Sequence, residues 1–180
     1  MNAPCCCENF SPAGGPRADV RRIRISLPNQ TLALLDDAGK LLLSYSVSTS
    51  KNGPGETKDS FCTPRGKHVI RAKIGAGAKE NTVFVGRRPT GEVYTAELGA
   101  CHPGRDWMLT RILWLSGCEL GFNRLGMVDT MQRYIYIHGS PDSTAMGEAG
   151  SIGCIRMRNR DIVELFDAIS PGTLVEIVEI

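Results

Sequence analysis

The sequence lacks the features that direct a chain to a membrane or to nucleic acid. No apolar run approaches the ~20 residues that a membrane-spanning helix needs. The opening segment, Met1–Asp19, lacks the apolar core of ~7–15 residues that secretory signals carry. The 21 basic and 19 acidic residues give a net charge of +2 and form no long block of one sign. We therefore expect a soluble protein with no transmembrane segment and no nucleic-acid partner.

Metal-binding spacings are also missing. The chain has no Cys-x-x-Cys pair and no His-x-x-x-His pair, so we expect no cofactor and keep a zinc site only as a minor alternative. Its ligands would have to come from scattered residues, namely Cys101, His102, Cys118, His138 and Cys154. Because the seven cysteines are an odd number, at least one thiol lies outside any intramolecular disulfide framework.

Length and composition favour one domain. A chain of 180 residues with a 42% hydrophobic fraction is ordinary for a single globular domain. Residues 1–19 combine proline, glycine and three adjacent cysteines, Cys5 to Cys7, with little apolar content. This composition predicts a flexible N-terminal tail with incidental thiols, followed by a domain over residues 20–180.

The hydrophobic pattern of that domain predicts mainly β-strands. Short apolar or alternating runs, bounded by glycine and proline, are typical of strands. They lie at residues 20–28, 31–36, 41–49, 68–74, 82–86, 92–98, 107–117, 133–139 and 173–180. The one helix that we expect covers residues 159–170, with Asn159 as its cap, Asp161 in its first turn and an apolar stripe that packs on the sheet.

Two residues near the C-terminal end suggest nucleophilic chemistry. His138 ends the strand predicted at residues 133–139, and Cys154 follows Gly153 in a turn. A thiol has a pKa of about 8.5, so a reactive cysteine needs a base such as His138 within reach. The backbone N–H groups of Gly153 and Cys154 are candidates for an oxyanion hole, since glycine permits the close turn required. The alternative is a buried unreactive cysteine beside a half-buried histidine.

Neighbouring groups would support this pair. The backbone carbonyl of Gly139 is the nearest candidate to orient the imidazole, and Asp142 is a weaker one. Arg156 shares a face with Cys154 if the segment is extended. It would favour the thiolate, clamp a substrate carboxylate or brace a carbonyl, and the alternative is a solvated surface charge.

The two stretches "IYIHGS" and "GSIGCIRMRNRDIVELFD" resemble the signature of the L,D-transpeptidase catalytic domain family, of YkuD type. The matching positions are His138, Gly139, Ser151, Gly153, Cys154, Ile155, Arg156, Asn159 and Asp161. The resemblance extends to an N-terminal β-hairpin and to a Thr-Pro-x-Gly turn at residues 63–66, and it covers roughly residues 20 to 180. Ile152 departs from it, because many relatives have a polar residue there.

The resemblance implies a mainly β fold, a β-sandwich-like mixed sheet with one short helix after the catalytic cysteine. It implies a peptidoglycan L,D-transpeptidase, with Cys154, His138 and Gly139 as catalytic residues. Ser151, Gly153 and Arg156 would bind substrate or form the oxyanion site. Cys154 would attack the bond between diaminopimelate and D-alanine in a tetrapeptide stem, and His138 would give a proton to the departing D-alanine.

The same resemblance leaves alternatives open. The acyl thioester passes to an amine of a second stem in a transpeptidase, or to water in an L,D-carboxypeptidase. The partners are therefore donor and acceptor peptidoglycan stems. A non-catalytic peptidoglycan-binding module is an alternative of another class, although such a module is expected to lack the cysteine or the histidine.

The family implies a periplasmic or cell-envelope location, while no export signal is visible in the chain. A start codon assigned too late, another export route and a cytoplasmic substrate all fit these two observations. Trp107 and Tyr136 are expected either to line a substrate groove or, more simply, to pack in the core.

Overall fold

The computed structural model describes residues 21–179, so the N-terminal tail predicted at residues 1–19 lies outside the described part of the chain. The strands are β1 (Arg22–Ser26), β2 (Thr31–Leu35), β3 (Leu41–Ser46), β4 (Gly66–Ile74), β5 (Thr82–Val85), β6 (Arg88–Val93), β7 (Met108–Gly117), β8 (Tyr136–Ser140), β9 (Ile155–Arg158) and β10 (Leu174–Val178). The helices are α1 (Ala96–Cys101), the 3-10 turn η1 (Gly126–Val128) and α2 (Asn159–Ala168).

The strands form one mixed sheet. Its order is β3-β2-β1-β10-β4-β7-β5-β6, with β8 paired to β7 and β9 paired to β8. The β1–β10 and β8–β9 pairs are parallel, and the other pairs are antiparallel. The prediction of a mainly β, mixed-sheet fold with a helix after Cys154 is confirmed, and α1 is a second short helix.

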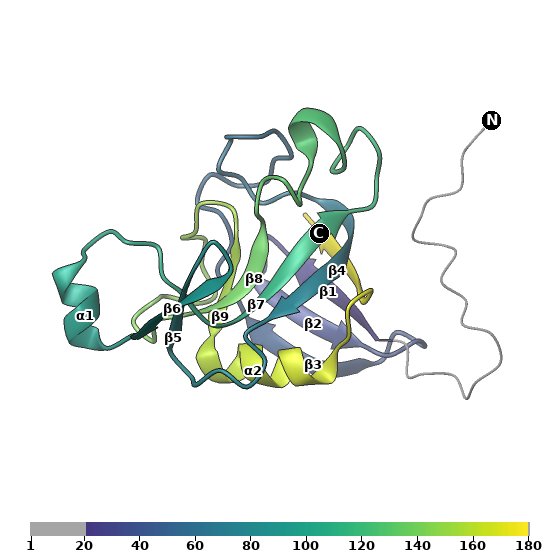
Figure 1. The fold of residues 1–180 in the computed structure, drawn as a ribbon. Coiled ribbons are helices and arrows are strands. Elements are labelled where there is room, and N and C mark those ends of the chain that lie inside the picture. Colours follow the sequence, from purple (N-terminus) through teal and green to yellow (C-terminus); the bar gives the residue numbers. More distant parts are fainter. Residues whose placement is uncertain (1–20, 180) are drawn as a thin grey trace, which may run out of the picture.

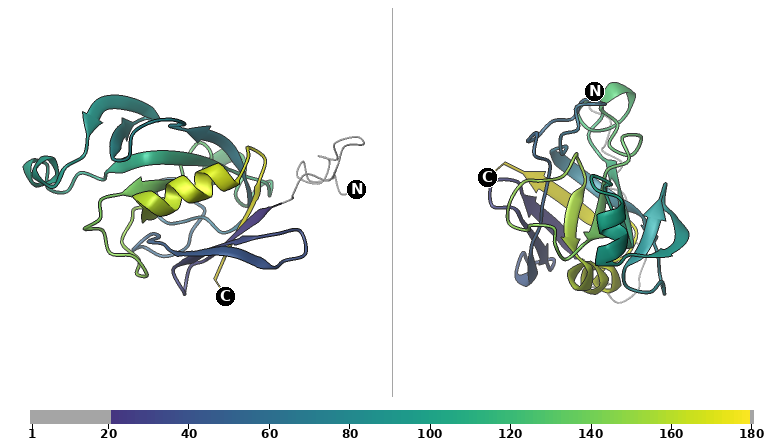
Figure 2. Two further views of the ribbon diagram at one scale, coloured as in Figure 1. Left: turned by 90° about the horizontal axis from the view of Figure 1, so that it is seen from below. Right: turned by 90° about the vertical axis from the view of Figure 1, so that its left-hand side faces the viewer.

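The sheet curls until its two ends meet. Residues that follow β3 form isolated bridges with the β9 region, Ser48 with Arg156 and Ser50 with Ser151. Figure 2 shows α2 lying between the hairpin of β2 and β3 and the strands on the other side of the molecule. Buried side chains of α2, including Ile162, Leu165 and Phe166, join the main core with residues of β1, β2, β7 and β10. The curled sheet therefore encloses one main core, which α2 completes.

Strands β5 and β6 and helix α1 stand out from the body of the sheet (Figure 1). Residues 92–98 were predicted as a strand, and this prediction is wrong in its second half. Strand β6 ends at Val93, and α1 begins at Ala96. The reason is a helix cap: the Thr95 side chain accepts a hydrogen bond from the backbone N–H of Leu98, which satisfies a donor that the helix leaves free.

Asn159 was predicted to cap α2, and this prediction is wrong. The N-cap position belongs to Arg158, which makes no side-chain cap hydrogen bond. The Asn159 side chain is instead buried, accepting a hydrogen bond of 2.6 Å from Thr110 Oγ1 and donating one of 2.7 Å to Asn81 Oδ1. Asn159 therefore ties the start of α2 to β7 and to the loop before β5.

The two faces of β8 have different surroundings. Ile137 points into the main core with Ile155 and Met157 of β9. Tyr136 packs on the opposite side, in a smaller cluster with Phe84 and Ile112. The strand begins later than predicted because Tyr134 has a φ of 57°, a left-handed conformation that interrupts an extended strand.

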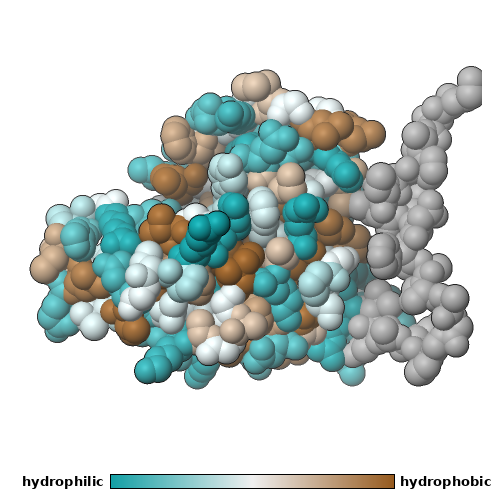
Figure 3. Space-filling model, in the orientation of Figure 1, coloured by the Kyte–Doolittle hydropathy of each residue, from teal (hydrophilic) through white to brown (hydrophobic). Residues whose placement is uncertain are grey.

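Polar and apolar residues are interspersed over the face of the molecule seen in Figure 3. None of the helices within residues 21–179 combines the length and the apolar character needed to cross a membrane.

Candidate active site

The candidate residues lie on or beside the face of β8 and β9 that points away from the main core. These strands are parallel, and His138 lies in register with Arg156, so the two side chains point to the same side. Cys154 directly precedes β9, two residues before Arg156. The fold thus places His138 and Arg156 side by side, next to the turn that carries Cys154.

His138 is fully buried and held in one orientation. Its Nδ1 lies 2.8 Å from the carbonyl oxygen of Gly139, and its Nε2 is buried without a hydrogen-bond partner. When Nδ1–H donates to that carbonyl, Nε2 keeps its lone pair and can accept a proton. The Gly139 carbonyl, and not Asp142, therefore occupies the orienting position.

The imidazole is neutral at neutral pH. Burial lowers the pKa of His138 below its ordinary value of 6.5, while the charge of Asp106 and the bond to Gly139 oppose this shift. A neutral imidazole is the form that acts as a general base.

The Cys154 thiol is protonated in the same state. Its Sγ lies 3.6 Å from the carbonyl oxygen of Tyr134. Burial raises the pKa of Cys154 to about 12, opposed chiefly by a backbone hydrogen bond with Tyr136. Thiol and imidazole are thus both uncharged, and the thiolate requires a proton transfer to a base.

Ser151 shapes the turn that carries the cysteine. Its Oγ donates a hydrogen bond of 2.5 Å to the carbonyl oxygen of Cys154 and accepts one of 3.2 Å from the N–H of Gly153. The Gly153 N–H, which we interpreted as an oxyanion donor, is therefore occupied by Ser151 in this conformation. It would have to exchange that partner before it could bind an oxyanion.

Gly153 adopts a backbone conformation that side chains rarely allow. Its φ is 125°, and a Cβ at this position would lie 3.3 Å from Ile135 Cδ1 and 3.4 Å from the carbonyl oxygen of Cys62. Any larger residue would be strained there. The glycine of the motif thus allows the Cys154 turn to approach the loop that carries Cys62.

Arg156 makes two contacts. Its Nη1 donates to the carbonyl oxygen of Gly150 at 3.1 Å, and its Nη2 lies 2.6 Å from Asp106 Oδ1. The arginine side chain is only 17% exposed, so it is not a solvated surface charge. Asp106 lies in the loop between α1 and β7 and was not identified from the sequence, where no motif surrounds it.

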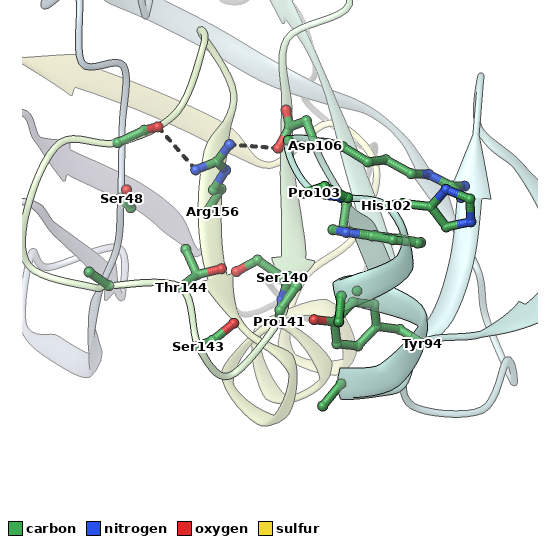
Figure 4. A pocket seen from close by; sticks show the side chains of 18 of the residues that line it. Ser48, Tyr94, His102, Pro103, Asp106, Ser140, Pro141, Ser143, Thr144 and Arg156 are labelled. Atoms are coloured by element: carbon green, nitrogen blue, oxygen red, sulfur yellow. Dashed lines mark hydrogen bonds and ion pairs between the residues drawn. The ribbon is translucent and has the colours of Figure 1, made fainter.

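A hollow of about 630 Å³ opens beside Arg156 (Figure 4). Its walls come from α1, from the loop before β7 and from the loop that follows β8, and they include Trp107, Ser140 and Glu148. Trp107 borders this hollow, but it is only 7% exposed and packs with Val83 and Leu109 in a small hydrophobic cluster, as the core alternative predicted. Tyr136 does not line this hollow and packs as a core residue, its hydroxyl accepting a hydrogen bond of 2.9 Å from Arg87.

A second hollow of about 170 Å³ lies on the Tyr134 side of the cysteine. Its lining includes Phe61, Arg133, Tyr134 and Ile152. Ile152, the departure from the family pattern, is 47% exposed here. Ile152 thus borders this hollow and Gly150 borders the larger one, while Cys154 and His138 line neither of them.

The cysteines and histidines that the structure describes do not gather into a metal site. Among residues 21–179, no group of three or more His, Cys, Asp or Glu side chains is arranged to hold a metal ion.

Sequence comparison matches most of the chain to one family. The profile of the L,D-transpeptidase catalytic domain family, YkuD, matches residues 20–177. The proposed L,D-transpeptidase YkuD of Bacillus licheniformis is 49% identical over 41 residues, which are 23% of this chain and 25% of that protein. Its counterpart from Bacillus subtilis is 46% identical over 41 residues, with the same coverage. The chain thus aligns with about a quarter of these curated relatives.

Solved structures show the same fold. L,D-transpeptidase 3 from Mycobacterium tuberculosis matches with a TM-score of 0.55 and 16% identity, over 90% of this chain and 62% of that one. An L,D-transpeptidase from Xylanimonas cellulosilytica matches with a TM-score of 0.53 and 19% identity, over 91% of this chain and 63% of that one. The chain therefore spans less than two thirds of these structures.

Proposed function

The chain belongs to the L,D-transpeptidase catalytic domain family, and from this membership we propose that it is a cysteine acyltransferase that acts on peptidoglycan stem peptides. The proposed donor is a tetrapeptide stem, whose bond between diaminopimelate and D-alanine is broken. The proposed acceptor is an amine of a second stem, so the product is a cross-link.

The first half of the proposed reaction forms a thioester. His138 Nε2 takes the thiol proton of Cys154, and the thiolate attacks the carbonyl carbon of diaminopimelate. The tetrahedral intermediate then breaks its bond to the nitrogen of D-alanine. The imidazolium of His138 returns the proton to that nitrogen, D-alanine leaves, and the diaminopimelate carbonyl stays bonded to Sγ.

In the second half of the proposed reaction, the acceptor amine is the nucleophile and the Cys154 thiolate is the leaving group. An acceptor amine attacks the thioester carbonyl and gives a proton to His138, which passes it to the departing thiolate. A new amide forms, and Cys154 is again a thiol. Charges appear only during each step, which agrees with the uncharged thiol and imidazole of the structure.

One observation carries this proposal. The Nε2 atom of His138 is buried without a partner, while Nδ1 is held by the Gly139 carbonyl. A buried polar atom without a hydrogen bond is destabilising by about 1–3 kcal/mol. The Nε2 atom of His138 lies on the same side of the sheet as Arg156, the register partner of His138 on β9. Cys154 precedes Arg156 by two residues, so this side is where a base for the thiol is needed.

Hydrolysis of the same thioester would make the protein an L,D-carboxypeptidase. Two separate hollows border the segment that carries Cys154, one at Gly150 and one at Ile152, and two such hollows favour a reaction with two peptide substrates. A non-catalytic binding module is disfavoured because both the cysteine and the histidine are present. We also propose the cell envelope as the site of action, since the family acts on peptidoglycan.

The proposal is tested with purified protein and a disaccharide tetrapeptide. Mass spectrometry separates a cross-linked dimer, expected for a transpeptidase, from a tripeptide, expected for a carboxypeptidase. The absence of both products and of free D-alanine would contradict the proposed enzyme.

A further inference from the structure

The ion pair of Arg156 and Asp106 lies on the wall of the larger hollow, where both side chains remain accessible. Their side chains are 17% and 31% exposed, respectively, and both line the hollow. Arg156 uses one N–H for Asp106 and one for the Gly150 carbonyl. A guanidinium carries five N–H donors and a carboxylate can accept about four hydrogen bonds, so each group can bind a further partner.

Ser48 adds an unsatisfied hydroxyl to this wall. It forms an antiparallel bridge with Arg156, accepting from and donating to its backbone at 2.9 and 3.0 Å. Directly opposed residues of such a pair place their side chains on the same face. The Ser48 side chain lines the hollow, is 1% exposed and has no hydrogen-bond partner for its Oγ. Figure 4 shows Arg156 between Ser48 and Asp106.

Ser48, Arg156 and Asp106 therefore form a row that offers a hydroxyl, a cation and an anion in that order. A hydroxyl and a guanidinium can donate to an anion, and the neighbouring carboxylate can accept from a cation. A ligand with a carboxylate and an ammonium on the same carbon matches this order. A ligand with a carboxylate alone would leave Asp106 without a partner of opposite charge other than Arg156.

The row also lies at a definite distance from the nucleophile. Arg156 follows Cys154 by two residues along an extended segment, which corresponds to about 6.6 Å at the usual rise of a strand. A substrate acylated on Cys154 would therefore reach the row only through a short flexible side chain. The side chain of diaminopimelate has this form, because a short methylene chain separates its reacting carbonyl from a second amino-acid centre.

We propose that Ser48, Arg156 and Asp106 form a subsite for the free amino-acid end of the donor's diaminopimelate side chain. The carboxylate binds to Arg156 and the Ser48 hydroxyl, and the ammonium binds to Asp106. This inference rests on the proposed function, and it makes Ser48 and Asp106 specificity residues of this chain.

The test compares three tetrapeptides with different third residues. One carries diaminopimelate, one carries diaminopimelate with an amidated side-chain carboxyl group, and one carries lysine, which keeps only the ammonium. Dissociation constants are measured by calorimetry with the Cys154→Ala protein. The ratio of kcat/KM values for D-alanine release is measured with the intact nucleophile.

We expect diaminopimelate to be preferred over its amide by roughly 10-fold or more, the size of one hydrogen bond to a charged group. Ser48→Ala should reduce this preference several-fold. Asp106→Asn should weaken binding of all three peptides, chiefly through KM. Ser143→Ala, on the exposed rim of the same hollow, is the matched control and should change neither quantity.

Equal affinity of the parent Cys154→Ala protein for diaminopimelate and its amide would overturn the subsite. An unchanged preference in the Ser48→Ala protein would exclude that residue from it. The binding measurement does not need turnover, so a protein that binds selectively but releases no D-alanine would refute the proposed function and keep the subsite.

Discussion

The Thr63 hydroxyl joins two motifs that are far apart in the sequence. Its Oγ1 donates a hydrogen bond of 3.0 Å to the carbonyl oxygen of Gly153 and accepts one of 3.0 Å from the backbone N–H of Ser50. Thr63 is fully buried. The threonine of the Thr-Pro-x-Gly turn thus holds the backbone directly before Cys154.

Replacing Thr63 with valine should therefore impair both stability and turnover. Valine keeps the shape but leaves the Ser50 N–H and the Gly153 carbonyl without this partner, at a cost of about 1–3 kcal/mol for a buried group. We expect a lower unfolding midpoint and slower release of D-alanine. Thr63→Ser keeps the hydroxyl and is the control. Equal turnover in the valine and serine variants would show that the bond does not position the nucleophile.

Under the proposed function, Cys154 should be the site of acylation by a β-lactam, because a strained ring amide is an activated acyl donor for a nucleophilic thiol. We expect imipenem to add the mass of one molecule to this protein, with the modified peptide containing Cys154. Cys154→Ala should abolish the adduct. Cys62→Ala should retain it, although Cys62 is also a free and partly exposed thiol. An adduct that persists in the Cys154→Ala protein would refute the proposed nucleophile.

The pH profile should report the neutral His138. Burial lowers its pKa below 6.5, so the base is lost only when the pH falls below that value. We expect kcat/KM for D-alanine release to stay level from neutral pH down to about pH 6.5 and to fall below it. A decline that begins well above pH 6.5 would contradict a neutral resting imidazole. His138→Gln should reduce turnover by about 10²–10⁴-fold.

His68 should make the fold sensitive to acid. It is buried between the Gly66 carbonyl, at 3.0 Å, and Thr130 Oγ1, at 3.2 Å. Burial lowers its pKa from 6.5 to about 4. Between these values the unfolded chain binds a proton that the folded chain does not, so stability is full above pH 6.5 and falls toward pH 4. The shift corresponds to about 3 kcal/mol.

Urea unfolding at a series of pH values measures this loss. The His68→Asn protein keeps an amide near the position of Nδ1 but cannot titrate, so its stability should depend less steeply on pH in this window. The direct check is the pKa of His68 followed by NMR. A value near 6.5 in the folded protein would contradict the prediction.

Local sequence patterns were sufficient for most strands and for the placement of His138 and Arg156. The pattern of residues 133–139 predicted a strand that ends near His138, and the spacing of Cys154 and Arg156 predicted a common side. The second prediction depends only on the twofold period of a strand. The end of residues 92–98 was mistaken for a strand because the side-chain cap of Thr95 overrides a short apolar run.

Long-range contacts could not be read from these patterns. Asn159 looks like a helix cap, but Thr110 and Asn81 reach it from distant segments. Asp106 and Ser48 have no local signal, since the curling of the sheet brings Ser48 to Arg156 and the loop before β7 brings Asp106 to it. The sequence motif identifies Gly139, but it does not show why a glycine is needed there. A Cβ at this position would lie 2.7 Å from the Leu109 carbonyl oxygen, too close for any side chain.

The parallel pairing of β1 with β10 has a consequence for how the chain folds. These strands come from opposite ends of the described residues and lie side by side at the centre of the sheet, between β2 and β4. The pairing requires closure of a loop that contains almost the whole domain, and such non-local contacts slow folding. During synthesis, β1 can pair with β2 on one edge, but its other edge stays unpaired until β10 leaves the ribosome. We therefore expect slow, cooperative folding and a nascent chain prone to aggregate until β10 is made.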